Sequence, residues 1–471
     1  MSDTTIERQR TVSGGPGVAV LSWAQRRPLL SVFLLALIAR VIVAIVATNA
    51  FSGSLVLDDS TYFQMAKQAA AGETETWDAF TRALYDRTAT LVIPVTILFK
   101  IFGPIKLVGQ LLVALMGAAT AATTMRIGQE YLPQRWALLA GIGVALLPSQ
   151  VLWSSLLMKD AFVWVILTGL ALTVARANQT YGPRLATYGA VGAGLLFLLG
   201  HLREHTLVVA SLAVMLAAWV GVREGRLARG LGALAIGLVI PWVIGVGPAG
   251  FDLLTDHGSL VQRRALNAEG ANTNIVDPTP SIEGSETPSG RGDSGSTSQE
   301  PGGAGAPQDD GGTDAAGNGT EAGDASDEPS ATPGGASLDK QDDDLIDPAI
   351  AHLPRGLMVM LFEPYPWRSG GTASYDYARY EAVIWYPLVL AAALGLWGTR
   401  RYLRTLAFPL LAGGGILIMY ALAEGNVGTA FRHRGEFVWV VSLLAAGGLV
   451  RILEWRSRTG EGTQASPSSI S

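Results

Sequence analysis

Long apolar runs constrain this chain more than any other feature of its sequence. Of the 471 residues, 49% are hydrophobic and only 15% are charged, whereas a soluble domain carries about 25% charged residues. A helix that crosses a bilayer needs about 20 mostly apolar residues, and the first run, residues 29–50, meets that length. The sequence therefore predicts an all-α polytopic membrane protein.

We expect about ten transmembrane helices from the lengths of the apolar runs. They cover residues 29–50, 105–125, 136–153, 161–175, 185–200, 206–222, 230–246, 382–397, 406–423 and 437–450. Residues 88–102 are also apolar, but they number only about 15 and include Pro94 and Lys100. We interpret that segment as an interfacial or re-entrant helix of a large first external loop, residues 51–104.

Arginines predict the orientation of these helices. If residues 88–102 do not cross the bilayer, arginine clusters fall in alternate loops, on the same side as the basic N-terminal tail. The clusters are Arg126 and Arg135; Arg176 and Arg184; Arg223, Arg226 and Arg229; Arg400, Arg401 and Arg404; Arg451, Arg456 and Arg458. Because cytoplasmic loops carry an excess of basic residues, both termini and these arginine-bearing loops are predicted in the cytoplasm. The other loops are predicted outside the plasma membrane.

The chain divides into segments of different composition. A long insert within residues 249–349 is rich in Gly, Ser, Pro and Asp and has few large apolar residues. It therefore cannot bury enough surface to fold. We predict a cytoplasmic tail (1–28), an N-terminal transmembrane module (29–248), a disordered acidic external loop (249–349), an interfacial external segment (350–381), C-terminal transmembrane helices (382–455) and a cytoplasmic tail (456–471).

The predicted external loops collect most of the polar groups that could carry chemistry. They are Asp58 and Asp59 in the first loop; Lys159 and Asp160 in the second; His201, Arg203, Glu204 and His205 in the third; and Arg432, His433 and Arg434 in the last. A carboxylate can act as general base on a hydroxyl, and arginines can bind a phosphate through bidentate contacts. Together these groups suit group transfer from a lipid phosphate.

Each of these groups also has an ordinary structural interpretation. Asp58 and Asp59 could begin a solvated turn or cap a helix, and Lys159 and Asp160 could form a surface ion pair of little energetic value. Arg40 lies in the middle of the first apolar run. A charge at that depth marks either a functional site or a helix–helix contact, and the sequence leaves both interpretations open.

The joint arrangement resembles the GT-C superfamily of polyprenyl-phosphate-sugar-dependent glycosyltransferases, which includes protein O-mannosyltransferases and aminoarabinose transferases. The matching residues, within about 29–175, are Arg40, Asp58-Asp59, Tyr62-Phe63, Pro94, Phe102-Gly103, Gln110-Leu111-Leu112, Leu147-Pro148 and Lys159-Asp160. The resemblance implies a GT-C-like fold, a catalytic base at Asp58 or Asp59, and a second acid, Asp160, near the donor or a metal.

The expected function is that of an inverting glycosyltransferase. It would move a sugar from a polyprenyl-phosphate donor to a hydroxyl of a protein or glycan acceptor at the external face, and we assign the donor phosphate to Lys159, Arg203, Arg432, His433 and Arg434. Membrane lipid is a further partner, and no nucleic acid is expected. Metal use varies among such enzymes, so a divalent metal stays open and no other cofactor is predicted.

Two alternatives remain at this stage. An O-antigen-type polysaccharide polymerase or ligase would also use external arginines and histidines, but it needs no acid in the first loop. A transporter of a lipid-linked sugar is the other alternative. The charges gather at one face and no internal repeat is visible, whereas many transporters bind their substrate near the midplane between repeats.

Overall fold

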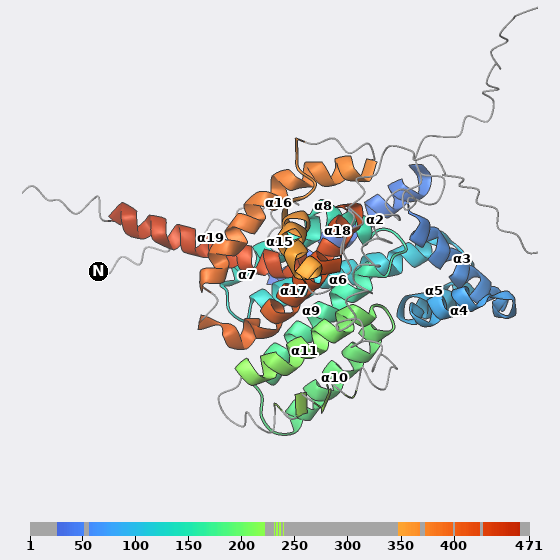
Figure 1. Ribbon diagram of the computed structural model, residues 1–471, viewed down its shortest axis with the longest axis horizontal. Coiled ribbons are helices and arrows are strands. Elements are labelled where there is room, and N and C mark those ends of the chain that lie inside the picture. The colour runs from blue at the N-terminus through green and yellow to red at the C-terminus, as the bar shows by residue number, and fades with distance from the viewer. Residues whose placement is uncertain are drawn as a thin grey trace, which may run out of the picture. The chain divides into compact units, whose positions relative to one another are not determined.

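The computed structural model describes residues 26–50, 56–221, 347–367, 373–398, 401–423 and 427–461, with a few positions between 230 and 239. These residues form α-helices joined by short turns and contain no β-strand, which confirms the predicted all-α class (Figure 1). The N-terminal tail before residue 26, most of the expected span 230–246, nearly all of the acidic insert and the end of the C-terminal tail lie outside the described residues.

Six described helices are long and apolar enough to cross a membrane. They are Pro28–Asn49, Lys106–Gly128, Asp160–Ala177, Pro183–Gly200, Tyr377–Trp397 and Thr405–Ala423. Gly428–Glu436 and Val438–Leu453, bent by 66° at their junction, add a seventh if they cross as one span. The chain is therefore a membrane protein by the length and composition of its helices, and the larger number of ten spans stays a prediction.

The expected span 136–153 is broken into two helices, α7 (Gln134–Leu146) and α8 (Pro148–Trp153). Pro148 has no N–H to donate, and a proline disfavours helical geometry at the residue before it. Leu147 accordingly has a ψ of 126°. The sequence interpretation of one continuous helix was wrong at this point, and α7 alone has only 13 residues.

Two buried charged side chains complete the backbone hydrogen bonding at this break. An unbroken helix would pair the Val144 carbonyl with the N–H of residue 148, which proline lacks. The guanidinium of Arg40, on α2 (Pro28–Ala50), donates instead to the Val144 and Ala145 carbonyls at 3.2 and 2.9 Å. On the other side of the break, the carboxylate of Glu381 accepts from the backbone N–H and the hydroxyl of Ser149.

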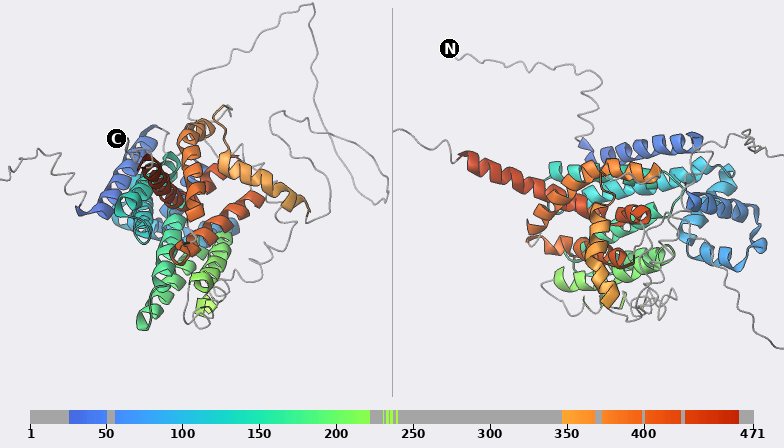
Figure 2. Two further views of the ribbon diagram at one scale, coloured as in Figure 1. Left: turned by 90° about the vertical axis from the view of Figure 1, so that its left-hand side faces the viewer. Right: turned by 45° about the horizontal axis from the view of Figure 1, so that its top comes forward.

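The helices pack in a small number of long interfaces. α6 (Lys106–Gly128) contacts α2, α7 and α9 (Asp160–Ala177), and α10 (Pro183–Gly200) covers another side of α9. α11 (Glu204–Gly221) lies against α17 (Leu403–Ala423), and α16 (Ala373–Gly398) lies along α19 (Val438–Glu461) (Figure 2). Since a Cβ at Gly395 or Gly448 would overlap the backbone of the facing helix, glycine permits the close approach of α16 and α19.

The segment between the first two long helices folds into short helices. α3 (Leu57–Ala71) carries Asp58 and Asp59 in its first turn, where the helix dipole favours negative charge. α4 (Ala79–Asp86) is capped by the Asp78 side chain, which accepts from the Thr81 N–H at 2.7 Å. α5 (Ala89–Phe102) has only 14 residues, a length short of a bilayer crossing. Its location at the membrane interface stays a prediction.

The C-terminal elements differ in extent from the expected segments. α15 (Asp347–Phe362) is followed by α16, which begins at Ala373 and so runs across the boundary expected at residue 382. α18 (Val427–His433) and a 3₁₀ turn, η4 (Arg434–Glu436), precede α19. α19 continues to Glu461, beyond the expected start of the C-terminal tail.

Candidate active site

A polar cavity of about 380 Å³ forms where the ends of several helices meet. Its lining comes from α3, α4, α10, α11, α18 and the segments next to them, and consists of Asp58, Tyr62, Leu84, Arg87, Lys159, Gly200, Leu202, Arg203, Glu204, His205, Arg432 and His433. Seven of the polar residues that the sequence placed in the external loops are in that list. Asp160, directly beneath the lining, pairs with two of its arginines.

Arg432 joins two carboxylates that are far apart in the sequence. Its Nη1 atom lies 2.7 Å from Asp58 Oδ2, and its Nε and Nη2 atoms lie 3.0 and 2.9 Å from Asp160 Oδ2. The Asp160 side chain is fully buried, whereas that of Asp58 is 38% exposed. One edge of the guanidinium is thus held in the protein interior, and the other reaches an accessible carboxylate in the cavity.

Arg203 extends this chain of charges into the interior. Its Nη2 atom lies 2.5 Å from Asp160 Oδ1, and its Nη1 atom lies 2.6 Å from Glu436 Oε1 and from the Tyr420 hydroxyl. Burial lowers the pKa of Arg203, but Tyr420, Glu436 and Asp160 outweigh that effect and raise it well above its ordinary value. Glu436 also accepts from the Thr206 hydroxyl at 2.9 Å, so these buried charges are paired, as their desolvation requires.

Lys159 contributes a second kind of cation. It lines the cavity beside Arg203 and Arg432, and no ion pair or hydrogen bond joins its ammonium group to any described residue. Burial, followed by the repulsion of Arg203 and Arg432, lowers the pKa of Lys159 from 10.5 to about 8. The ammonium group is therefore available to an anion that enters the cavity.

Two histidines flank one tyrosine at the cavity wall. The His433 ring stacks on Tyr420 with centroids 4.2 Å apart and an interplanar angle of 20°. His205 meets the same ring edge-on, with Nε2 lying 3.3 Å from the Tyr420 hydroxyl. Tyr420 lies inside an apolar helix, so the sequence offered no signal for it. Glu436 could have been found from the sequence, because it is a charged residue directly before an apolar run.

Asp59 faces away from the cavity, although it adjoins Asp58 in the sequence. Its carboxylate is buried, lies 2.7 Å from the Lys106 ammonium and accepts from the backbone N–H of Leu157 at 3.0 Å. These contacts connect the start of α3 to α6 and to the segment before α9. Asp59 therefore anchors the first turn of α3, which presents Asp58.

Three other residues assigned from the sequence also lie outside the cavity lining. Arg40 completes the α7–α8 break, as described above. Arg434 donates to the Met360 carbonyl at 2.9 Å and to the Glu363 carbonyl, and it lies over the Trp385 ring at 5.0 Å. His201 Nδ1 lies 3.1 Å from the carbonyl of Phe197. These contacts give Arg40 and Arg434 structural roles at helix ends.

The described residues do not form a metal-binding arrangement. Among them, no three His, Asp or Glu side chains are grouped so that they could hold an ion. The two acids closest to such a role, Asp58 and Asp160, are bridged by the guanidinium of Arg432.

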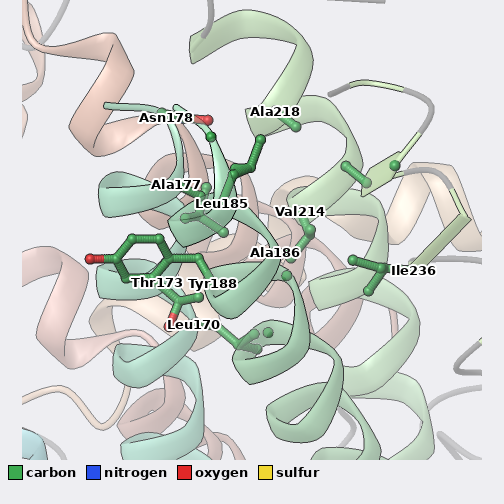
Figure 3. A pocket seen from close by; sticks show the side chains of 16 residues that line it. Leu170, Thr173, Ala177, Asn178, Leu185, Ala186, Tyr188, Val214, Ala218 and Ile236 are labelled. Carbon is green, nitrogen blue, oxygen red and sulfur yellow. The ribbon is translucent and has the colours of Figure 1, made fainter. Parts of the chain in front are cut away.

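An apolar cavity of about 450 Å³ lies toward the other ends of α9, α10 and α11 (Figure 3). Leu170 and Leu185 line it together with small residues, and Thr173, Asn178 and Tyr188 are the polar side chains of its wall. Because no acid, lysine, arginine or histidine belongs to that wall, the apolar cavity lacks the groups for acid–base chemistry.

Comparison with known proteins gives no further assignment. The chain matches no protein-family model and no curated protein. The polar cavity combines accessible acids, cations and histidines in one place.

Proposed function

We propose that this protein is a membrane glycosyltransferase that moves a sugar from a polyprenyl-phosphate donor to an acceptor hydroxyl. The observation that carries this proposal is the arrangement of Asp58, Arg432 and Lys159 around one cavity at the ends of apolar helices. It supplies an accessible base and two cations for a phosphate, as the resemblance to GT-C enzymes implies. The donor's long isoprenoid chain suits a site at a membrane surface.

The donor phosphate binds to Lys159 and to the Nη1 edge of Arg432. Lys159 has no partner among the described residues. Within the same part of the chain, the Nη1 atom of Arg432 pairs with the accessible Asp58 alone. Arg203, in contrast, is enclosed by Asp160, Glu436 and Tyr420. Arg203 is thus a positioning residue that holds Asp160, and Asp160 in turn orients Arg432.

Asp58 acts as the general base of the transfer. Its carboxylate accepts the proton of the acceptor hydroxyl while that oxygen forms a bond to the anomeric carbon of the sugar. The bond between the anomeric carbon and the phosphate oxygen breaks, and the electron pair leaves with the polyprenyl phosphate. Lys159 and Arg432 stabilise the negative charge that develops on the phosphate. Attack from the face opposite to the leaving group inverts the anomeric configuration.

The two carboxylates on Arg432 couple donor binding to this step. A phosphate oxygen that takes the Nη1 edge replaces Asp58, while Nε and Nη2 keep the guanidinium on Asp160. The Asp58 carboxylate is then released from Arg432 and can accept from the acceptor hydroxyl. Donor binding consequently precedes acceptor activation.

A transfer assay with purified full-length protein tests the function. The protein is reconstituted in nanodiscs with isotope-labelled polyprenyl-phosphate sugars, and membrane extracts supply acceptors. We expect a labelled product that Asp58→Asn abolishes and that Asp86→Asn, a change of an acid on neighbouring α4, leaves intact. Full activity of the Asp58→Asn protein, or no product from any donor of this class, would contradict the proposal.

A polysaccharide polymerase or ligase with a lipid-diphosphate donor is a second candidate. It is favoured by His433, which stacks on Tyr420 and lines the cavity together with Arg203 and Arg432. A product that forms only from lipid-diphosphate glycans, and that depends on Arg432 and His433 but not on Asp58, would establish this function instead.

A further inference from the structure

A second polar cavity lies at the opposite ends of the long helices. Its volume is about 260 Å³, and its lining includes Tyr131, Arg401, Tyr402, Gly447 and Arg451. α6 begins with Lys106, the partner of Asp59 near the polar cavity described above, and ends just before Tyr131. α19 likewise begins after Glu436, and its residues 443–451 lie along this second cavity. The two cavities thus lie at opposite ends of the same helices.

The charges at this second cavity are of one sign. Arg401 and Arg451 are exposed side chains of its lining, and no carboxylate belongs to that lining. Neither arginine forms an ion pair with a described acid. Glu130, which precedes Tyr131 in the chain, is already engaged by Arg126 and Arg176 at 3.2 and 2.6 Å. The two guanidinium groups therefore offer an anion several hydrogen-bond donors without a competing carboxylate.

An apolar wall lies next to these arginines. Leu443, Leu444 and Val450 of α19 form it, and the rings of Tyr131 and Tyr402 lie 5.6 Å apart beside it. The Tyr131 hydroxyl donates to the Leu443 carbonyl at 2.9 Å, which fixes that ring. The cavity is thus amphipathic, with phosphate-binding groups on one side and a hydrocarbon surface on the other.

We propose that this second cavity binds an anionic phospholipid. Arg401 and Arg451 contact the phosphate, because guanidinium groups bind phosphate through paired hydrogen bonds. The glycerol and the start of the acyl chains lie against the apolar wall of α19. Arg401 follows the span Tyr377–Trp397, and Arg451 lies in the last turn of Val438–Leu453, so both are near the level of the headgroups, where tyrosine is also favoured. Basic pockets between transmembrane helices are suited to such lipids.

The location of the cavity agrees with the arginine-rich face of the protein. On the topology predicted from the arginine distribution, this end of the helices faces the cytoplasmic leaflet, where anionic lipids are common in many membranes. The lipid would stay in place as a structural partner during catalysis at the other end. The proposal does not depend on the reaction that the polar cavity performs.

Lipid retention by the full-length protein tests this proposal. The wild-type protein and its variants are reconstituted in phosphatidylcholine nanodiscs with and without phosphatidylglycerol, and the bound phosphatidylglycerol is measured by native mass spectrometry. We expect Arg401→Gln and Arg451→Gln each to weaken retention about fivefold, since an arginine near the membrane surface contributes on the order of that factor. Arg184→Gln is the matched control, because Arg184 is exposed at the same ends of the helices but outside this lining.

A second variant separates a lipid from a free anion. A Cβ at Gly447 would meet no atom within 4 Å, so the helix can accept a side chain at this position, and the methyl groups of Gly447→Val narrow the apolar side of the cavity. We expect this variant to lose phosphatidylglycerol while its response to inorganic phosphate stays unchanged. Retention equal to that of the wild type in both arginine variants would overturn the proposal. The proposal would also be overturned if inorganic phosphate stabilised the protein as much as the lipid does and if Gly447→Val left that stabilisation unchanged.

Discussion

The Nη1 atom of Arg432 lies 2.7 Å from the Oδ2 atom of Asp58. This contact closes the cavity end of a chain of alternating charges that runs through Asp160 and Arg203 to Glu436. Every member except Asp58 is more than four-fifths buried. The accessible end of this chain can therefore exchange partners with a ligand, while the buried part stays paired.

Asp58 and Asp59 should respond differently to removal of charge. Asp58→Asn is expected to lower transfer about 10²- to 10⁴-fold, the usual contribution of a general base, with little change in thermal stability. Asp59→Asn leaves Lys106 without its carboxylate partner and should lower the free energy of unfolding by about 3 kcal/mol, as in other broken buried pairs. Thermal unfolding in detergent and the transfer assay measure the two effects. Equal stability losses in both variants would contradict the separate roles.

The low pKa of Lys159 predicts a pH-dependent donor affinity. The ammonium group is charged below pH 8 and neutral above it, so the KM for the donor should rise as the pH increases from about 7 to 9. Lys159→Arg should remove this rise, because arginine stays protonated throughout that range. The pH dependence of KM in the two proteins checks the assignment, and an unchanged pH profile in Lys159→Arg would assign the titration to another group.

The lowered pKa of Lys159 also predicts that its contribution to protein stability increases with pH, whereas donor affinity decreases. Between pH 8 and 10.5 the unfolded chain keeps a proton on Lys159 that the folded protein has released. The unfolded state therefore binds more protons in that window, and the contribution of Lys159 to the free energy of unfolding rises with pH. Lys159→Gln should therefore be more stable than the wild type at pH 7, and this difference in stability should be smaller at pH 9.5. Thermal unfolding of both proteins at the two pH values measures it.

Arg203 is predicted to be a structural requirement of the polar cavity. Arg203→Gln removes the charge that faces both Asp160 and Glu436, and loss of one partner from a buried ion pair costs about 3 to 5 kcal/mol. Arg87→Gln serves as the control, since that side chain is 70% exposed and pairs with Glu204 only at 3.5 Å. The control should change the free energy of unfolding by less than about 0.5 kcal/mol. Similar unfolding temperatures for both variants would show that the buried network contributes no stability.

Arg40 should stabilise the helix break and take no part in the chemistry. Arg40→Met removes the hydrogen bonds to the Val144 and Ala145 carbonyls and to the Ser154 hydroxyl. We expect a loss of several degrees in the unfolding temperature, since each buried acceptor left unsatisfied costs about 1 to 3 kcal/mol. The KM for donor should stay unchanged in the folded fraction. A variant with wild-type stability and no activity would place Arg40 in the reaction instead.

The sequence by itself determined the class of the protein and the position of most helices. Apolar runs such as 105–125 and 161–175 coincide with α6 and α9, because a helix in lipid must satisfy its own backbone and present apolar side chains. The short run 88–102 is a helix of limited length. The grouping of polar residues near the ends of these runs also indicated which of them could meet in one cavity.

Only the tertiary structure decided the role of each polar residue. Neighbouring residues on a helix point about 100° apart, so Asp58 and Asp59 face different surroundings, and their roles depend on Arg432 and Lys106, which lie far away in the chain. The function of Arg40 depends in the same way on a helix break more than 100 residues later. A buried charge takes its role from the partner that offsets its desolvation, and that partner is chosen by packing between helices rather than by the local sequence.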